Sequence, residues 1–518
     1  MVQKNNSLSI CESEMTTKVL LIRPNKIGSI GRTIKDNYAT VIPPLGLMYL
    51  ASALRIWCSI RLVVKILDTG VDVRKKEDII EKIHRFNPDV VGISSMTIEA
   101  DRALSIAQCV KKAKDNCKVI FGGPHAVTSP SSILESGSVD FVVLGEGERT
   151  ICELIECIVK GDDPTHISGI GFLKKGKVYT TSPRQPIENL DDIPFPAWDL
   201  VKVKRYTQAW NMQGYLARKY YHPIVTSRGC PFKCIYCHNL FGKKFRDRSP
   251  ENVVKEMKFL YDTYSIREFH IIDDIFNFNK DRVLRICDLI EKSNMDIRIA
   301  FPNGVRGDII DEEIIKKLKS VGCYSITYAV ETASKRLQQL IRKNLNLSKV
   351  ESSITISAQN SIFTQGFFMI GFPGETYAEM EKTIEFARKS DLHFAHFSQV
   401  RPFPNTELGE SLEGKIISVN WEDFEYRSDR INLSSVSEKD YKSIYRKAYL
   451  EVYLAKKRIE TLSKILTPSM FREFYSWVLD FGKASEEEFK VFLSHLACGK
   501  DEKKKHEQYI NSKTVFGR

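Results

Sequence analysis

The sequence predicts two α/β domains in series: an N-terminal doubly wound, Rossmann-like parallel sheet and a partial (β/α)6 barrel of TIM type, followed by a helical C-terminal extension. Short apolar runs alternate with helical periodicity over residues 18–160, and the alternation returns over residues 222–410. Residues 411–518 are charged and helical in pattern. A chain of 518 residues also exceeds one ordinary hydrophobic core, so several domains are expected.

Five strands are expected in the first domain, where apolar runs cover residues 18–23, 63–67, 89–95, 118–124 and 140–148. Helical periodicity marks residues 43–55, 79–86 and 100–114 and the segment that begins at Thr150. Ligands of doubly wound sheets bind beyond the carboxyl ends of the strands. Small residues and glycines gather at these ends, and we expect cofactor contacts from Ser95, Thr97, Gly122, Gly123, Gly145, Glu146 and Gly147.

Two segments outside the domains differ in composition. Residues 1–17 are polar and lack the apolar stretch of a secretory signal, so we expect a disordered N-terminus. Residues 161–221 carry the turn signals of a short β-rich segment and then a Pro-rich, extended run over residues 190–199. We expect this stretch to link the two domains.

Six strands are expected in the barrel, at residues 223–227, 268–272, 297–301, 325–330, 365–370 and 396–400. Catalytic groups of such barrels lie at the carboxyl ends of the strands. We expect cofactor contacts from the polar and glycine residues at these ends, which are Asp273, Asp274, Arg306, Glu331 and Gly371. Because successive side chains of a strand alternate in direction, only one of the two aspartates is expected to face the site.

Cys230, Cys234 and Cys237 follow the first barrel strand with C-x3-C-x2-C spacing. Three thiolates so close in sequence can ligate three irons of a [4Fe–4S] cluster and leave the fourth iron open. The alternatives are a zinc site and buried structural thiols, but zinc usually takes four protein ligands, and His238 could add only one. The other nine cysteines form no C-x2-C pair, so no second cluster is expected.

Residues 227–238, Ser-Arg-Gly-Cys-Pro-Phe-Lys-Cys-Ile-Tyr-Cys-His, resemble the cluster loop of the radical S-adenosylmethionine (SAM) enzymes. The first domain is similar to the cobalamin-binding domain that precedes the barrel in one large subgroup of that family. The shared segments are Pro-Pro-Leu-Gly-Leu at residue 43, Gly-Gly-Pro-His at residue 122 and Leu-Gly-Glu-Gly-Glu at residue 144. The resemblance covers roughly residues 18–410.

The resemblance implies three cofactors: a [4Fe–4S] cluster on the three cysteines, SAM on its open iron, and cobalamin in the first domain. It places Tyr236 and the Gly371 segment near the adenine of SAM, Glu331 at a polar contact, and an acidic residue, Asp273 or Asp274, at the amino group. Gly122 and Gly123 would allow a close approach of the corrin or its nucleotide tail.

One motif of the cobalamin-binding domains is missing. Many of them carry Asp-x-His-x-x-Gly after the first strand, and its histidine ligates cobalt. Here residues 23–31 contain no histidine. Cobalamin therefore binds without a histidine from this loop, or the domain has lost cobalamin and is a nucleotide-type or empty doubly wound domain.

The resemblance favours methylation of an unactivated carbon in a small-molecule or lipid-like substrate, with electrons from a reducing protein such as flavodoxin or ferredoxin. The alternative is radical oxidation, cyclisation or carbon–carbon coupling without net methyl transfer. A cobalamin- or cluster-binding sensor without catalysis is a third hypothesis. A sensor would form no 5′-deoxyadenosine under strong reductant.

Composition excludes other classes of function. The net charge is +12, but Lys and Arg are spread along the chain and the densest run, residues 500–506, is mixed in sign, so no nucleic-acid partner is expected. No apolar run approaches the length of a membrane span. A cluster that needs free thiolates suits a reduced, cytoplasmic setting.

Overall fold

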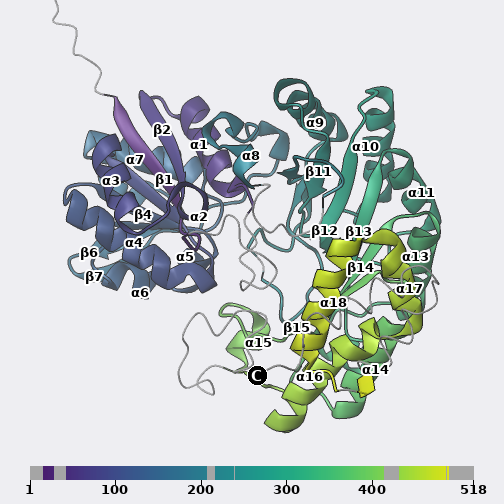
Figure 1. Cartoon of the computed structure of the whole chain (residues 1–518). Coiled ribbons are helices and arrows are strands. Elements are labelled where there is room, and N and C mark those ends of the chain that lie inside the picture. The colour runs from purple at the N-terminus through teal and green to yellow at the C-terminus, as the bar shows by residue number, and fades with distance from the viewer. Residues whose placement is uncertain are drawn as a thin grey trace, which may run out of the picture. The chain divides into compact units, whose positions relative to one another are not determined.

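The computed structural model describes residues 16–27, 42–206, 216–238, 240–412, 431–485 and 487–488. The chain divides into two compact units (Figure 1). The first comprises residues 1–32 and 39–210, and the second comprises residues 33–38 and 211–518. The predicted disorder of residues 1–17 falls almost wholly outside the described residues, although Thr17 already belongs to the first strand.

The first unit is built on a seven-stranded sheet of order β2-β1-β3-β4-β5-β6-β7. Its strands are β1 (Thr17–Arg23), β2 (Leu62–Asp68), β3 (Val90–Ser94), β4 (Lys118–Gly122), β5 (Phe141–Val143), β6 (Ile170–Lys174) and β7 (Lys177–Thr180). Its helices are α1 (Leu45–Trp57), α2 (Thr69–Asp72), α3 (Glu77–Phe86), α4 (Ala100–Ala113), α5 (Pro124–Thr128), α6 (Pro130–Glu135), α7 (Glu148–Lys160) and α8 (Val203–Tyr206).

The first five strands are parallel and both faces of their sheet are covered, which confirms the predicted doubly wound class. Leu47 of α1 and Ile155 of α7 pack with Val19 on one face. Ile83 of α3 and Val110 of α4 pack with Val91 on the other. Alternate residues of β1 and β3 thus enter two separate cores, as expected of central strands.

Two details of the first unit differ from the sequence prediction. The β-rich part of the predicted linker joins the sheet, because β6 pairs antiparallel with β5 and β7 pairs antiparallel with β6. The fifth strand ends at Val143, five residues before its predicted end at residue 148. Gly145 takes a positive φ of 89°, which breaks the strand and lets α7 begin at Glu148.

The second unit is built on a parallel six-stranded sheet of order β15-β14-β13-β12-β11-β8, an open partial barrel. Its strands are β8 (His222–Ile224), β11 (Glu268–Ile271), β12 (Arg298–Val305), β13 (Cys323–Glu331), β14 (Phe363–Ile370) and β15 (Phe394–Gln399), and β9 (Ser227–Arg228) and β10 (Arg246–Asp247) form a separate ribbon. Its helices are α9 (Pro250–Tyr264), α10 (Lys280–Lys292), α11 (Glu312–Ser320), α12 (Lys335–Leu340), α13 (Leu347–Gln359), α14 (Tyr377–Lys389), α15 (Glu407–Glu410), α16 (Glu438–Tyr453), α17 (Lys456–Ile465) and α18 (Pro468–Gly482).

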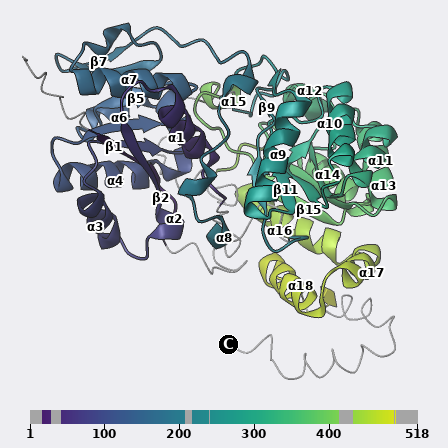
Figure 2. The same cartoon turned by 90° about the horizontal axis from the view of Figure 1, so that it is seen from above.

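Local sequence signals start the barrel helices where they are needed. The Ser249 side chain caps α9, with Pro250 in the first turn. Asp311 caps α11, and Thr376 with Glu379 forms a capping box at α14. Helices α9, α10, α11 and α13 lie along the outer side of the sheet in both views (Figures 1 and 2).

The first barrel strand is shorter than predicted. Residues 223–227 were expected to be one strand, but β8 ends at Ile224 and the β9 ribbon begins at Ser227. The Thr226 amide donates to Asp273 rather than to a neighbouring strand, so the sheet ladder stops before it. This early exit releases the chain into the loop that carries the three cysteines.

Candidate active site

The three cysteines lie on the loop between β9 and β10, at the carboxyl end of the barrel sheet. The loop backbone is tied at several points: Cys230 N–H donates to Gly242 O at 3.3 Å, and Ile235 N–H donates to Ile341 O at 3.2 Å. Partial burial first, and also the neighbouring Cys234 thiol, raises the pKa of Cys230. Backbone hydrogen bonds therefore fix the loop at Cys230 and at Ile235.

This thiol set fits an iron–sulfur cluster. Among the residues that the structure describes, no three His, Cys, Asp or Glu side chains converge on a point where one metal ion could bind. A cluster does not require that convergence, because each thiolate ligates a different iron. Partial burial also favours the thiol over the thiolate at Cys230, a penalty that bound iron would offset.

A buried ion pair stands beside the cysteine loop. Glu331, at the end of β13, accepts a hydrogen bond from Lys343 Nζ at 2.7 Å, and both residues are less than a tenth exposed. The same Nζ lies 3.4 Å from Tyr236 Oη, between Cys234 and Cys237 in sequence. Glu331 has a φ of 68°, a strained value for a non-glycine residue that is typical of functional sites.

The two aspartates after β11 have different surroundings. Asp273 is 3% exposed and accepts hydrogen bonds from Thr226 N and Oγ1 and from Ser227 Oγ, at 2.5–2.6 Å. Asp274 is exposed and accepts from Gly229 N at 3.3 Å, directly before Cys230. Asp273 therefore fastens the start of the cysteine loop, and Asp274 is the aspartate placed beside the cysteines.

Arg306, after β12, is held in the same region. Its Nε lies 2.8 Å from Asp308 Oδ1, and its guanidinium carbon lies 3.8 Å from the centroid of the Phe232 ring. Phe232 lies between Cys230 and Cys234 in sequence. Arg306 thus contacts the cysteine loop through an aromatic ring.

Gly371 directly follows β14 and has a φ of 101°, and its N–H donates to Glu375 Oε2 at 2.6 Å. A Cβ at this position would lie 2.5 Å from Tyr441 Oη. The C-terminal helix α16 therefore packs against the loop for which the resemblance implies a contact with adenine. Tyr441 was not among the predicted site residues, although its four-residue spacing from Tyr445, Tyr449 and Tyr453 is visible in the sequence.

In the first unit, the predicted residues follow β3, β4 and β5, which are neighbours in the sheet. Ser95 Oγ donates to Met96 O at 2.8 Å. Thr97 is 4% exposed, and its Oγ1 has no hydrogen-bond partner among the described residues. A buried hydroxyl without a partner is unfavourable unless a ligand supplies one, so this edge fits a cofactor.

The glycines at this edge serve different purposes. Gly123 has a φ of 87°, and a Cβ there would lie 2.9 Å from Ser95 N and O, so the residue permits contact between two loops. Gly122 has only an ordinary neighbour, Val143 Cβ at 4.0 Å. Gly145 has a φ of 89° and faces open space.

The residues around Gly145 and the nearby histidine are also placed. A Cβ added at Gly147 would lie 3.1 Å from Leu50 Cδ2. Glu146 Oε2 accepts a hydrogen bond from Ile187 N at 2.8 Å. Burial lowers the pKa of His125 to about 4, and its Nδ1 lies 3.3 Å from Thr128 Oγ1.

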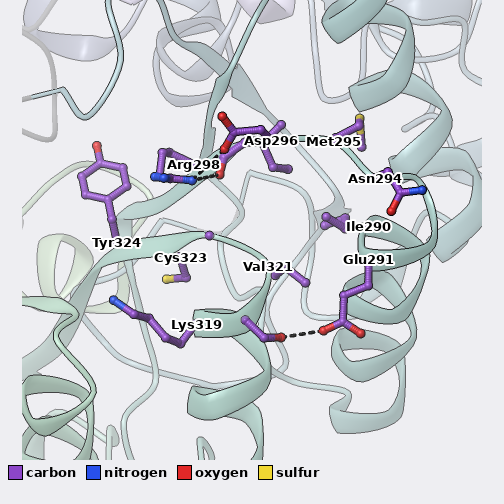
Figure 3. A pocket seen from close by; sticks show the side chains of 13 residues that line it. Ile290, Glu291, Asn294, Met295, Asp296, Arg298, Lys319, Val321, Cys323 and Tyr324 are labelled. Carbon is purple, nitrogen blue, oxygen red and sulfur yellow. Dashed lines mark hydrogen bonds and ion pairs between the residues drawn. The ribbon is translucent and has the colours of Figure 1, made fainter.

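A depression of about 500 Å³ lies away from these residues (Figure 3). It is lined by Asp296, Arg298, Val321 and Cys323, at the amino ends of β12 and β13. Arg298 and Asp296 pair at 3.1 Å. Catalytic groups of barrels lie at the opposite ends of the strands, so we do not assign the site here.

Each of the two units contains a region that matches a known protein family. The B12 binding domain matches residues 31–155, and the Radical SAM superfamily matches residues 224–387. An uncharacterized methyltransferase of Pyrococcus horikoshii is 33% identical over 85% of this chain and 93% of its own length. None of the described helices is both long enough and apolar enough to cross a membrane.

Two further relatives have more specific names. The cytidylyl-2-hydroxyethylphosphonate methyltransferase of Streptomyces wedmorensis is 28% identical over 77% of this chain and 82% of its own length. The anaerobic magnesium-protoporphyrin IX monomethyl ester cyclase of Rubrivivax gelatinosus is 25% identical over 79% of this chain and 72% of its own length.

Two solved structures share the fold. The cobalamin-dependent SAM radical enzyme OxsB, with aqua-cobalamin and SAM bound, has a TM-score of 0.69 at 15% identity and covers 96% of this chain and 75% of its own. The radical SAM methyltransferase TsrM from Kitasatospora setae has a TM-score of 0.64 at 20% identity, with 77% and 76% coverage.

Proposed function

Because this chain belongs to the cobalamin-dependent radical SAM enzymes, with a B12-binding domain before the radical SAM domain, we propose that it methylates an unactivated carbon of a small-molecule or lipid-like substrate. The observation that carries methylation is the 33% identity, over 85% of the chain, to a protein named as a methyltransferase. When bound, the cluster with SAM supplies a 5′-deoxyadenosyl radical and cobalamin supplies the methyl group.

In the second unit, we assign cluster ligation to Cys230, Cys234 and Cys237. Asp274 is exposed next to Cys230, and its carboxylate suits the ammonium of SAM. Tyr236 packs edge-on against Phe372 at 5.8 Å, which provides an apolar wall for a flat ring such as adenine. Asp274 follows β11, which is next to β8 in the sheet, and Tyr236 of the cysteine loop extends the candidate site to Phe372 after β14.

In the same unit, Glu331 and Gly371 have supporting roles in this proposal. The Glu331–Lys343 pair places one charge of each sign beside Tyr236 and so adds no net charge to the site. The Gly371 loop keeps its backbone close to the site because its N–H groups are fixed by Glu375. These residues orient the cofactor and exclude water, while the cofactor carries out the difficult chemistry.

In the first unit, we assign cobalamin to the edge formed by the ends of β3, β4 and β5. The buried hydroxyl of Thr97 has no hydrogen-bond partner among the described residues. No atom lies within 4 Å of the position that a Cβ of Gly145 would occupy. Ser95, Gly122, Gly123, Glu146 and Gly147 shape the loops of this edge. A reducing protein such as flavodoxin or ferredoxin completes the system.

The test is product analysis after anaerobic incubation with SAM carrying a labelled methyl group, a strong reductant, cobalamin and a lipid and small-molecule cell extract. The proposal expects S-adenosylhomocysteine and 5′-deoxyadenosine to form together, with label in a new extract component. Boiled enzyme and the Cys234→Ala variant are the controls. If the labelled methyl group stays in SAM although the enzyme contains both the cluster and cobalamin, the result would contradict methyl transfer.

A radical cyclisation or oxidation is the second candidate. Its supporting observation is the 25% identity to a protein named as a magnesium-protoporphyrin monomethyl ester cyclase. The same incubation separates the two, because cyclisation yields 5′-deoxyadenosine and an altered substrate but neither S-adenosylhomocysteine nor methyl label in the product.

A further inference from the structure

The loop between the first two cysteines carries an aromatic ring that a buried cation holds in place. Phe232 lies midway between Cys230 and Cys234. The guanidinium carbon of Arg306 lies 3.8 Å from the centroid of that ring, within the range of a cation–π contact. Only 11% of the Arg306 side chain is exposed, and partial desolvation strengthens such a contact.

The guanidinium is fixed in orientation by its neighbours. Arg306 Nη2 donates to Asp308 Oδ2 at 3.2 Å, and Nε lies 2.8 Å from Asp308 Oδ1 without hydrogen-bond geometry, so the two side chains form an ion pair with one hydrogen bond. Arg306 Nη2 also lies 3.4 Å from Asn344 O. Nη2 thus meets two acceptors, Asp308 and Asn344, while the guanidinium carbon lies over the Phe232 ring.

The backbone of Arg306 is fixed as well. Asn277 Nδ2 donates to Arg306 O at 2.8 Å, and Arg306 N donates to Asn277 Oδ1 at 3.2 Å. On the loop side, the Phe278 ring meets Phe232 edge-on at 6.3 Å, and Phe245 lies 5.0 Å from Phe278. Phe232 therefore sits between a rigid cation and a second aromatic ring, both from elements that follow other strands.

We propose that Arg306 is a positioning residue of the cluster loop: through Phe232 it holds the segment between Cys230 and Cys234 in the shape that receives the cluster. This inference rests on the proposed function and refines it, because the sequence placed Arg306 among direct cofactor contacts. An anchored loop loses less conformational freedom when iron binds and releases iron more slowly.

The test is a double-mutant cycle with Arg306→Ala, Phe232→Leu and the double variant. The first measurement is the anaerobic rate of iron loss from reconstituted protein to a ferrous chelator, without SAM. The second uses apoprotein: the rate of tryptic cleavage at Lys233, which is exposed within the anchored segment. We expect each single variant to raise both rates several-fold and the double variant to raise them no further, because the two residues form one contact.

Two further variants sharpen the test. Phe232→Tyr keeps the ring and is expected to retain wild-type rates. Arg298→Ala is the matched control, because Arg298 begins the strand that Arg306 follows but pairs with Asp296 at the opposite end. If Arg306 had only a structural role unrelated to the loop, Arg306→Ala would raise neither the cleavage rate at Lys233 nor the rate of iron chelation above the rates of the Arg298→Ala control.

Three results would overturn the inference. One is Arg306→Ala raising the KM for SAM with chelation and cleavage rates unchanged, which would make Arg306 a direct cofactor contact. Another is a Phe232→Leu variant with wild-type rates of chelation and cleavage. A third is a double variant in which the effects of the two substitutions on these rates are fully additive. If wild-type protein takes up no cluster, the proposed function fails, but cleavage of the apoprotein at Lys233 still decides the loop contact.

Discussion

The Tyr453 hydroxyl lies 2.9 Å from both the amide nitrogen and the carbonyl oxygen of Ala395, so one side chain pairs both backbone groups of an edge-strand residue. Tyr449 makes the same double contact with Phe397, at 3.3 Å and 3.1 Å. The tyrosines recur every fourth residue and therefore lie on one face of α16. In Figures 1 and 2, α16 lies beside β15, and α18 lies beside α16.

The C-terminal extension therefore closes the open edge of the barrel. An incomplete barrel leaves the N–H and C=O groups of its last strand without a partner strand, and an exposed edge invites aggregation. A row of phenolic hydroxyls can donate and accept at once, which suits this edge. Tyr441 continues the row to Ile370 O, next to the Gly371 loop.

Tyr453→Phe is expected to destabilise the second unit by about 1–3 kcal/mol, because two buried backbone groups of Ala395 lose their partner. Urea unfolding of the apoprotein measures the change. Tyr377→Phe is the matched control, since Tyr377 lies on α14 in the same unit and is 38% exposed. Equal stability of the two variants would contradict the edge-closing role of α16.

Cys234→Ala is expected to abolish 5′-deoxyadenosine formation and to lower the iron content, because the cluster loses one of its three thiolates. Iron analysis and product chromatography check both. Cys58→Ala, outside the motif in the first unit, should behave as wild type. Full iron loading and normal turnover in Cys234→Ala would refute the ligand assignment.

Asp273→Ala and Asp274→Ala are expected to fail differently. Asp273 is buried with three short hydrogen bonds from Thr226 and Ser227, so its loss should destabilise the second unit by about 2–4 kcal/mol. Asp274→Ala should leave the free energy of unfolding within about 0.5 kcal/mol and weaken SAM binding. Titration with SAM and urea unfolding separate the effects, and negligible effects in both variants contradict the assignment.

Gly371→Ala is expected to impair SAM binding, because the new Cβ would collide with Tyr441 Oη at 2.5 Å and the backbone has a positive φ of 101°. Gly374→Ala in the same loop is the control, with a φ of 66° and no atom within 4 Å of its Cβ. It should carry only the backbone strain, about 1–2 kcal/mol in unfolding free energy. Indistinguishable SAM affinities of the two variants would remove the steric argument.

Acid sensitivity is expected from Glu379, whose pKa is lowered to about 2 by hydrogen bonds from Arg336 first and then from Ser334 and Thr376. A carboxyl with a lowered folded-state pKa stabilises the protein above its ordinary value of 4.5, and this stability is lost as pH falls toward 2. Arg336 is half exposed, so we expect a loss of about 1–2 kcal/mol.

The measurement for Glu379 is the free energy of unfolding of the apoprotein between about pH 6 and pH 3. Glu379→Gln should be less stable than wild type at the upper end, and the difference should shrink toward the lower end. A constant difference across this range would mean that the Glu379 charge is not the source of its stabilising effect.

The sequence predicted the order of strands and helices and the strand ends to which we assign the site, because each prediction rests on local apolar periodicity and turn residues. Because side chains alternate along a strand, the sequence predicted that only one of Asp273 and Asp274 faces the site. Which of the two it is became clear only from the contact of Thr226 with Asp273. The contacts of Arg306 with Phe232 and of Gly371 with Tyr441 join residues about 70 apart, and no local pattern encodes them.

The most direct test of the central claim is an absorbance spectrum and cofactor extraction of protein produced with added cobalamin and purified without oxygen. A cobalamin-dependent radical SAM enzyme is expected to contain stoichiometric corrinoid together with a [4Fe–4S] cluster. A cluster without corrinoid, even after reconstitution, would contradict the cobalamin assignment. The protein would then carry out radical chemistry with the cluster and SAM only. Absence of both would contradict the two-cofactor enzyme itself.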